Sequence, residues 1–119
     1  MPQYKLGEVE FRFANLIWTH EPLSSGTLVK LAEQELKWKK STTYTILRRL
    51  CERGIFQNRD GIVSSLCTKK EYYAIQSEQF VDETFSGSLP QFLSAFSSRK
   101  KLSPEEIAEI QELIDQYRG

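Results

Sequence analysis

Residues 38–54, WKKSTTYTILRRLCERG, read as a helix with two different faces, and the rest of the chain is best understood around them. Apolar side chains recur at helical spacing on one face: Ile46, Leu47, Leu50 and Cys51. The other face has short hydroxyls near its start and arginines near its end: Thr42, Thr45, Arg49 and Glu52, flanked by Ser41, Tyr44 and Arg48. We expect Gly54 to end this helix as a left-handed cap.

Such a face has the chemistry of a nucleic-acid reader. Short hydroxyls approach base edges and phosphates closely, and arginines hydrogen-bond guanine and phosphate. An ordinary amphipathic helix with a solvated basic face is the alternative interpretation, because charged helix faces are common.

Charge is distributed unevenly along the 119 residues, although the formal net charge is zero. Residues 1–67 carry a net charge of +3 and residues 68–119 a net charge of −3. Seven basic residues and one acid, Glu52, lie between positions 37 and 59; the basic ones are Lys37, Lys39, Lys40, Arg48, Arg49, Arg53 and Arg59. A local basic patch attracts a phosphate backbone even when the whole protein is neutral.

The segments on either side of this helix complete a winged helix-turn-helix. Helices are predicted over about residues 7–18 and from residue 24 or 25 to about 36, followed by a basic turn at 37–40 in which Trp38 is a packing anchor. After Gly54, two β-prone runs flank the pair Asp60-Gly61, which is a strong hairpin signal. This wing would place Arg59 at its tip against the sugar-phosphate backbone; a hairpin that only covers the core is the alternative.

Three further helices are predicted in residues 68–119. Capping signatures stand at residues 68–71, 88–91 and 103–106, and residues 97–101 read as a polar linker. The apolar residues of these helices are Tyr73, Phe80, Phe85, Leu89, Phe92, Leu93, Phe96, Ile107, Ile110, Leu113, Ile114 and Tyr117. A segment of this length is too short for a good core of its own, so we expect these residues to bury against a second copy of the chain. A monomer whose tail folds back is the alternative.

The fold class predicted from these patterns is mainly α with a small β wing. It comprises a winged helix-turn-helix DNA-binding domain at residues 1–67 and a helical dimerisation domain at residues 68–119. The N-terminus has no apolar signal core and no run is long enough to span a membrane, so we expect a cytoplasmic protein without membrane insertion.

Catalysis and metal chemistry find little support in the sequence. It has no glycine-rich phosphate loop, no HExxH and no GxSxG motif, so we expect no enzyme, no cofactor and no small-molecule substrate. Cys51 and Cys67 form no CxxC or Cys/His cluster and are interpreted as buried free thiols, so no metal site is expected. His20, the single histidine, is assigned no role.

Five segments together resemble the penicillinase repressor family (BlaI, MecI and CopY) in order and spacing. They are LGEVEFRFANLIW (6–18), the quoted helix, GIFQNRDG (54–61), LPQFLSAF (89–96) and LSPEEIAEIQELID (102–115). The resemblance covers nearly the whole chain. It implies a dimeric winged-helix repressor of bacterial genes for antibiotic resistance or copper handling, which reads operators with TACA and TGTA half-sites.

The resemblance also implies roles for single residues. Thr42 and Tyr44 would meet bases, and the residues that would assist on bases or phosphates are Ser41, Thr43, Thr45, Arg48 and Arg49. Lys40 from the basic turn and Arg59 from the wing complete the predicted DNA-binding set. The copper branch carries a C-terminal CxCx4-5CxC motif, which this sequence lacks, so metal sensing by that route is not expected.

In the β-lactam branch, a membrane sensor-protease is expected to relieve repression by cutting an Asn-Phe bond in the tail. The matching bond here joins Ala95 and Phe96, so the phenylalanine is kept and the asparagine is not. Cutting there would remove the last helix and weaken the dimer. Two other classes of function stay open from the residues alone: a winged-helix protein–protein interaction module without DNA binding, and a regulator with a small-molecule pocket between the dimer halves.

Overall fold

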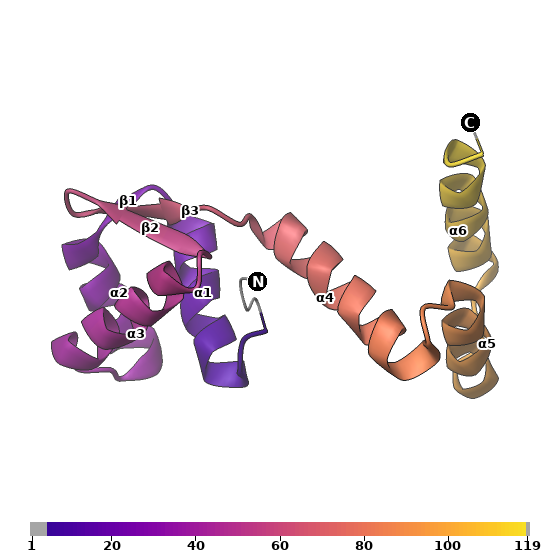
Figure 1. Ribbon diagram of the computed structural model, residues 1–119, viewed down its shortest axis with the longest axis horizontal. Helices are drawn as coiled ribbons and strands as arrows, with labels where there is room; N and C mark the ends of the chain where they lie inside the picture. The colour runs from indigo at the N-terminus through magenta and orange to yellow at the C-terminus, as the bar shows by residue number, and fades with distance from the viewer. Residues whose placement is uncertain (1–4, 119) are drawn as a thin grey trace. The chain divides into compact units, whose positions relative to one another are not determined.

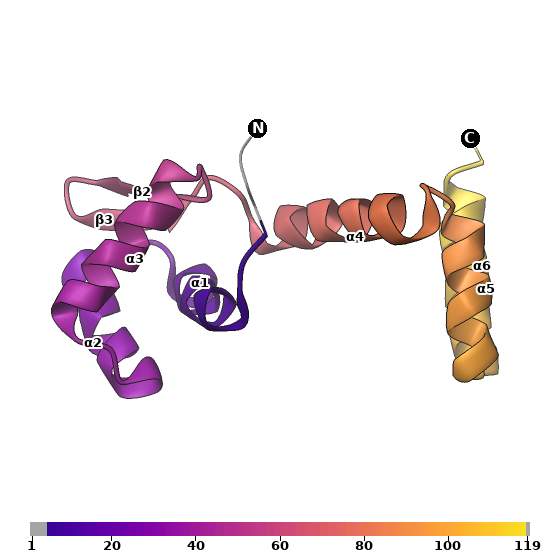
Figure 2. The ribbon, with the colours of Figure 1, turned by 60° about the horizontal axis from the view of Figure 1, so that its bottom comes forward.

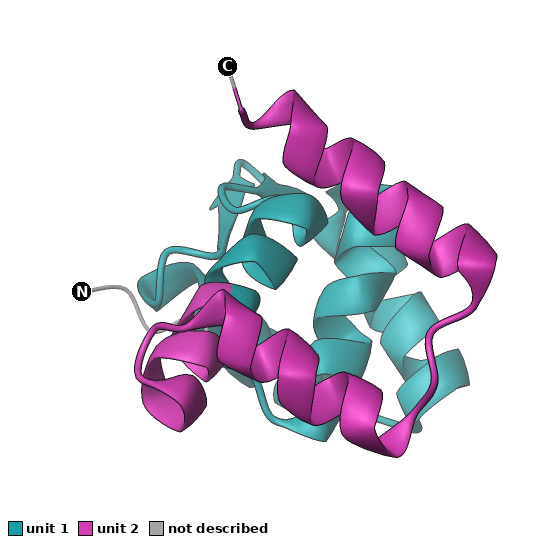
Figure 3. Cartoon of the chain, turned by 90° about the vertical axis from the view of Figure 1, so that its right-hand side faces the viewer, with its two compact units in different colours: residues 1–77 teal, residues 78–119 magenta. Residues whose placement is uncertain are grey.

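The computed structural model describes residues 5–118, which form two compact units. The first unit runs to Ser77 and the second begins at Glu78 (Figure 3). Each unit is described by itself below.

Three helices and a small sheet build the first unit, in the winged-helix order that the sequence predicts. The elements are α1 (Glu8–His20), β1 (Leu23–Ser24), α2 (Ser25–Leu36), α3 (Lys40–Glu52), β2 (Phe56–Arg59) and β3 (Ile62–Ser65). The sheet is antiparallel with the order β1-β3-β2, and it lies along one side of the three helices (Figure 1). Strand β1 was not predicted, because two residues carry no alternation and Leu23 becomes a strand residue only by pairing with Val63.

The wing turn has the chemistry that its sequence predicts. Asp60 and Gly61 have φ values of 52° and 85°, the left-handed pair that a tight two-residue hairpin requires. The side-chain oxygen of Asn58 accepts a hydrogen bond of 3.0 Å from the Gly61 N–H, and Arg59 pairs with Ile62 next to the turn. The predicted hairpin is confirmed.

The end of α3 is fixed by its own backbone. Gly54 has a φ of 80°, and its N–H donates to the Cys51 carbonyl at 3.0 Å, while the Ile55 N–H donates to the Leu50 carbonyl at 3.1 Å. These two bonds form a Schellman motif, which satisfies the last carbonyls of the helix and directs the chain into β2. The prediction that Gly54 ends the helix in the left-handed conformation is confirmed.

One hydrophobic core fills the first unit. Its fully buried large residues come from all three helices and the sheet: Phe13, Ile17, Leu28, Leu50, Ile55, Phe56 and Val63. The ring centroids of Trp38 and Phe13 lie 5.0 Å apart, as expected if Trp38 is a packing anchor. Trp18 donates its indole N–H to the Cys67 carbonyl at 3.0 Å, which joins α1 to the chain leaving β3.

Helix α4 (Lys69–Phe85) begins in the first unit and ends in the second. The ring of Tyr72 is buried and lies 5.4 Å from Trp18 and 5.8 Å from Phe11. The two units therefore divide ten residues after the predicted boundary at 67/68, because the first turns of α4 contribute to the first core.

The second unit contains the end of α4, α5 (Leu89–Arg99) and α6 (Pro104–Gln116). The hydroxyls of Ser88 and Ser103 cap α5 and α6, accepting from the N–H of the third residue of each helix, Gln91 and Glu106, at 3.2 and 3.1 Å, as the sequence predicts. Helix α5 continues to Arg99, so the linker is shorter and later than the predicted 97–101. Neither α5 nor α6 buries a single side chain.

Two adjacent residues of α3 test whether its inner face supports the first core. Leu50→Ala should lower the free energy of unfolding by about 2–5 kcal/mol, because the side chain is fully buried. Arg49→Ala, the matched control on the exposed face, should change it by less than about 0.5 kcal/mol. Urea unfolding at one fixed protein concentration measures both. Equal losses for the two variants would show that α3 does not present one inner and one outer face.

Candidate nucleic-acid interface

Helix α3 carries its polar residues on the side that the core leaves uncovered. Thr43, Leu47 and Leu50 are buried, and they turn toward α1, α2 and the sheet. The exposed residues of α3 include most of the predicted DNA-binding set: Lys40, Ser41, Thr42, Thr45, Arg48 and Arg49. Arg59 is also exposed, at the end of β2 beside the wing turn. The structure thus brings seven of the nine predicted residues to the surface of the first unit.

Thr43 corrects the prediction. It is fully buried, and its hydroxyl donates to the Lys39 carbonyl at 3.2 Å. A residue without exposed surface cannot contact a duplex, so its predicted role in assisting on bases or phosphates is wrong. The helical periodicity of the sequence already indicates this burial, because Thr43 lies four residues before Leu47 and seven before Leu50, on the inner face.

Tyr44 is half-buried, and its hydroxyl donates to the Ser25 hydroxyl at the start of α2, 3.2 Å away. The bond ties α3 to α2 and uses the hydrogen of the hydroxyl, whose oxygen can still accept. Contact between Tyr44 and a base stays a prediction.

The start of α3 has an electrostatic arrangement that opposes helix stability. Its N-cap is Lys39, no side chain caps its first amides, and its first turn begins with Lys40 and holds no acid. The start of α6, by contrast, has a serine cap and two acids in its first turn. Because the N-terminal end of a helix carries a partial positive charge, lysines there are unfavourable until an anion arrives.

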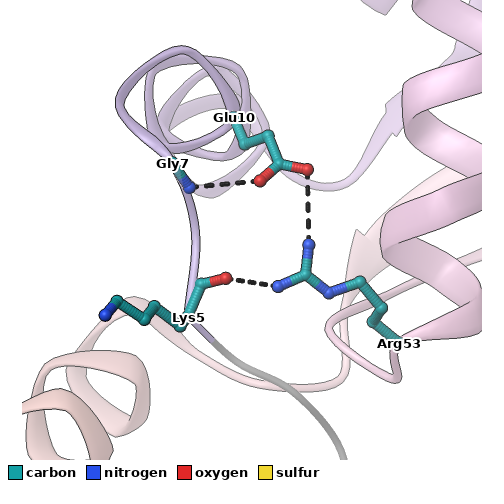
Figure 4. Close-up of polar contacts among 4 residues, drawn as sticks. All are labelled: Lys5, Gly7, Glu10 and Arg53. Carbon is teal, nitrogen blue, oxygen red and sulfur yellow. Dashed lines mark hydrogen bonds and ion pairs between the residues drawn. The ribbon is translucent and has the colours of Figure 1, made fainter.

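Two kinds of arginine lie near this surface. Arg53 forms an ion pair with Glu10, 3.3 Å between nitrogen and oxygen, and also donates to the Lys5 carbonyl (Figure 4). Glu10 in turn accepts from the Gly7 N–H at 3.1 Å. By contrast, Arg48 and Arg49 have no hydrogen bond or ion pair with any other residue in the described range 5–118. The basic patch counted from the sequence therefore includes one arginine that serves the fold.

A hollow of about 260 Å³ lies between α3 and β2, open to solvent. Five residues line it: Tyr44, Leu47, Arg48, Cys51 and Asn58. The wing beside it is held to α1 by Glu21, whose carboxylate accepts from the Ser65 N–H and hydroxyl, both at 2.8 Å.

Three exposed residues near this surface lie outside the predicted DNA-binding set: Lys37, Lys39 and Asn58. The two lysines belong to the predicted basic turn, so the sequence carries a signal for them. Asn58 gave no signal, because only the pairing of β2 and β3 brings it beside α3.

The apolar residues predicted for dimerisation are largely uncovered in the second unit. The rings of Phe80, Phe85 and Phe92 meet edge to face, with centroids 5.6–6.0 Å apart. Along α6, Ile107, Leu113 and Ile114 are 53%, 55% and 47% exposed. Tyr73 differs from the rest of this set, because its half-exposed ring contacts Phe11 in the first unit.

The two cysteines are free thiols, Cys67 buried and Cys51 partly so. Burial raises the pKa of both thiols, and the charges of Glu52 at Cys51 and Glu71 at Cys67 raise it further. Within residues 5–118, no three His, Cys, Asp or Glu side chains are grouped so that they could hold a metal ion. No helix in the same range is long and apolar enough to cross a lipid bilayer.

Comparison with known proteins places nearly the whole chain in one sequence family. The family model described as penicillinase repressor matches residues 6–116. The chain is 21% identical over 119 residues to the penicillinase repressor of Bacillus licheniformis, covering 97% of this chain and 93% of that protein. It is 22% identical over 116 residues to the methicillin resistance regulatory protein MecI of Mammaliicoccus sciuri, covering 94% of each.

The charge at the start of α3 makes a testable prediction about stability. Changing Lys40 to Gln and then to Glu should raise the free energy of unfolding stepwise, by roughly 0.3–1 kcal/mol in total at low ionic strength, because each step suits the helix dipole better. Urea unfolding in 20 mM and in 1 M salt measures the series, and the gain should shrink in high salt. A stepwise loss of stability would mean that Lys40 supports the fold.

Proposed function

The chain belongs to the penicillinase repressor family, and on this basis we propose that it is a transcriptional repressor which binds operator DNA as a homodimer. Such a protein is a regulator and not an enzyme. The observation that carries the proposal is the exposed face of α3, where hydroxyls and two arginines without a partner in residues 5–118 lie on a helix whose inner face is buried in the core.

Three features of that face favour DNA over an unspecified acidic partner. Its uncapped amino end and its lysines suit a phosphate group. Thr42 and Thr45 follow on the exposed face with hydroxyl oxygens that can accept hydrogen bonds, although the Thr45 hydroxyl donates to the Ser41 carbonyl at 2.9 Å. Arg48 and Arg49, which have no partner among residues 5–118, can bind guanine or phosphate. A helix of this size fits the major groove, and the adjacent wing carries Arg59 toward the neighbouring backbone.

The second unit supports the homodimer. Helix α6 repeats its apolar residues at positions 107, 110, 114 and 117, the spacing of a coiled-coil seam, and its acids lie on the other faces. Within the described chain, Ile107, Ile114 and Tyr117 of this seam are exposed and Ile110 is half-buried. An uncovered apolar stripe of this kind marks an interaction site, and a second copy offers a matching stripe.

Two-fold symmetry of the protein would be mirrored in its operator. Two copies of α3 related by such an axis would read inverted half-sites, so the operator is a pseudo-palindrome. The resemblance noted from the sequence supplies the half-sites TACA and TGTA.

Relief of repression by proteolysis, or by another signal, completes the proposal. The bond between Ala95 and Phe96 lies inside α5, whereas proteases bind extended chain, so α5 has to open before it is cut. In the single chain α5 buries no side chain, so opening costs less there than in a dimer that covers its apolar residues. Cutting would separate α6, and with it the proposed dimer seam, from the DNA-binding unit. A membrane sensor-protease is the partner expected to cut.

The proposal is tested by titrating the protein onto a duplex with a TACA/TGTA palindrome and onto a scrambled duplex, at several salt concentrations. The palindrome should bind more tightly.

Arg49→Ala should weaken binding and, if Arg49 contacts a phosphate, reduce the slope of log K against log salt by about one. Arg99→Ala, which removes a basic residue from α5, is the matched control and should leave affinity and slope unchanged. Unchanged affinity and slope for Arg49→Ala would remove that residue from the interface. Absence of binding to either duplex in low salt would refute DNA recognition and leave a protein–protein interaction module.

A further inference from the structure

We propose that the hollow between α3 and β2 is a seat for one phosphodiester of the DNA backbone, held by Arg48 and Asn58. This inference rests on the DNA binding proposed above and deepens it. It adds Asn58 to the interface and assigns Arg48 to a phosphate instead of a base.

The hollow is built by one stripe of α3 facing one strand. Tyr44, Arg48 and Cys51 follow each other at intervals of four and three residues, so they lie in a row along the helix. Asn58 faces this row from β2, and Figures 1 and 2 both show α3 lying beside the β2–β3 hairpin. The row is next to the exposed face that carries Thr45 and Arg49.

The polar groups around the hollow are hydrogen-bond donors. The guanidinium of Arg48 is unpaired among the described residues. The amide oxygen of Asn58 is occupied by the Gly61 N–H, which leaves the NH2 group of Asn58 for a ligand. The hydroxyl of Tyr44 is committed to Ser25. Two donors without a strong acceptor between them suit an oxyanion.

The remaining walls suit the sugar on either side of a phosphate. The side chain of Leu47 and the ring of Tyr44 are apolar, and the Cys51 thiol is only a weak acceptor. Deoxyribose presents C–H groups to such walls, whereas a base edge would leave its own donors unpaired there.

The dimensions of an α-helix in the major groove place the hollow opposite the sugar-phosphate backbone of the DNA. An α-helix with its side chains is about 10–12 Å across, and the major groove is about 12 Å wide. When the Thr42, Thr45 and Arg49 face points into the groove, the stripes on the flanks of the helix meet the groove walls, which are sugar and phosphate. The 44/48/51 stripe is such a flank, on the side of the wing.

The first test uses Asn58→Asp in the full-length protein. Aspartate keeps an oxygen for the Gly61 N–H, so the turn should survive, but it replaces the NH2 donor with a negative charge. Affinity for the palindromic duplex should fall by about tenfold or more, and the salt slope should fall by about 0.9, the value for one phosphate. Gln34→Glu, the same chemical change on the exposed surface of α2, is the matched control and should keep affinity within about threefold. Circular dichroism and urea unfolding check that both variants fold.

The second test locates the contact on the DNA. Single phosphates of the duplex are replaced by neutral methylphosphonates, one position at a time. At one position in each half-site, the replacement should lower the affinity of the wild-type protein. At that position it should lower the affinity of Asn58→Asp or Arg48→Ala little further, because these variants have already lost the contact. At every other sensitive position, the methylphosphonate should lower the affinity of the variants by the same factor as that of the wild type.

Three results would overturn the inference, and they are distinguishable. If the wild type binds the duplex and Asn58→Asp has the same affinity and salt slope as Gln34→Glu, the proposed phosphate seat is wrong and the proposed function stands. If the wild type binds no duplex, the proposed function fails and the seat fails with it. If phenyl phosphate shifts the NMR signals of Arg48 and Asn58 while no methylphosphonate position couples to them, the hollow takes a free organic phosphate and not the DNA backbone.

Discussion

Burial of the inner face of α3 is the constraint on which the rest of the first unit depends. Leu47 and Leu50 hold the helix against α1, α2 and the sheet, and Thr43 closes the same row with its hydroxyl bonded to Lys39. A helix anchored along one row cannot rotate, so every residue on the opposite face has a fixed direction. The Schellman end at Gly54 then sets where β2 and the wing begin.

Because α3 is fixed in this way, its charged side chains form a surface of constant orientation. Among the described residues, Arg48 and Arg49 have no hydrogen bond or ion pair, and lysines stand at the uncapped start of the helix. Arg53, close to them in sequence, joins α1 to α3 through Glu10. Natural helices usually place acids, not lysines, at the amino end. A surface that departs from this rule beside a well-packed core is best explained by an anionic partner, which the proposed function identifies as DNA.

Much of this structure could be predicted from the sequence because its signals are local. The caps of α5 and α6, the Asp60-Gly61 turn and the end of α3 each depend on a few adjacent residues. What was missed depends on residues far apart in sequence. The pairing of Leu23 with Val63, the Arg53–Glu10 ion pair, the burial of Tyr72 beside Trp18 and the approach of Asn58 to α3 all require the finished fold. Thr43 was the avoidable error, since its register with Leu47 and Leu50 was already visible.

The proposed DNA-binding helix lies in one unit and the proposed dimer seam in the other, and both have to act in the same complex. Sedimentation velocity of the full chain with one fluorescent palindromic duplex measures the mass of that complex. Two chains on each duplex are expected, and an Ile114→Glu variant, changed in the seam, should not hold the pair together. A single chain on each duplex, or a duplex that sediments alone in low salt, would contradict the account.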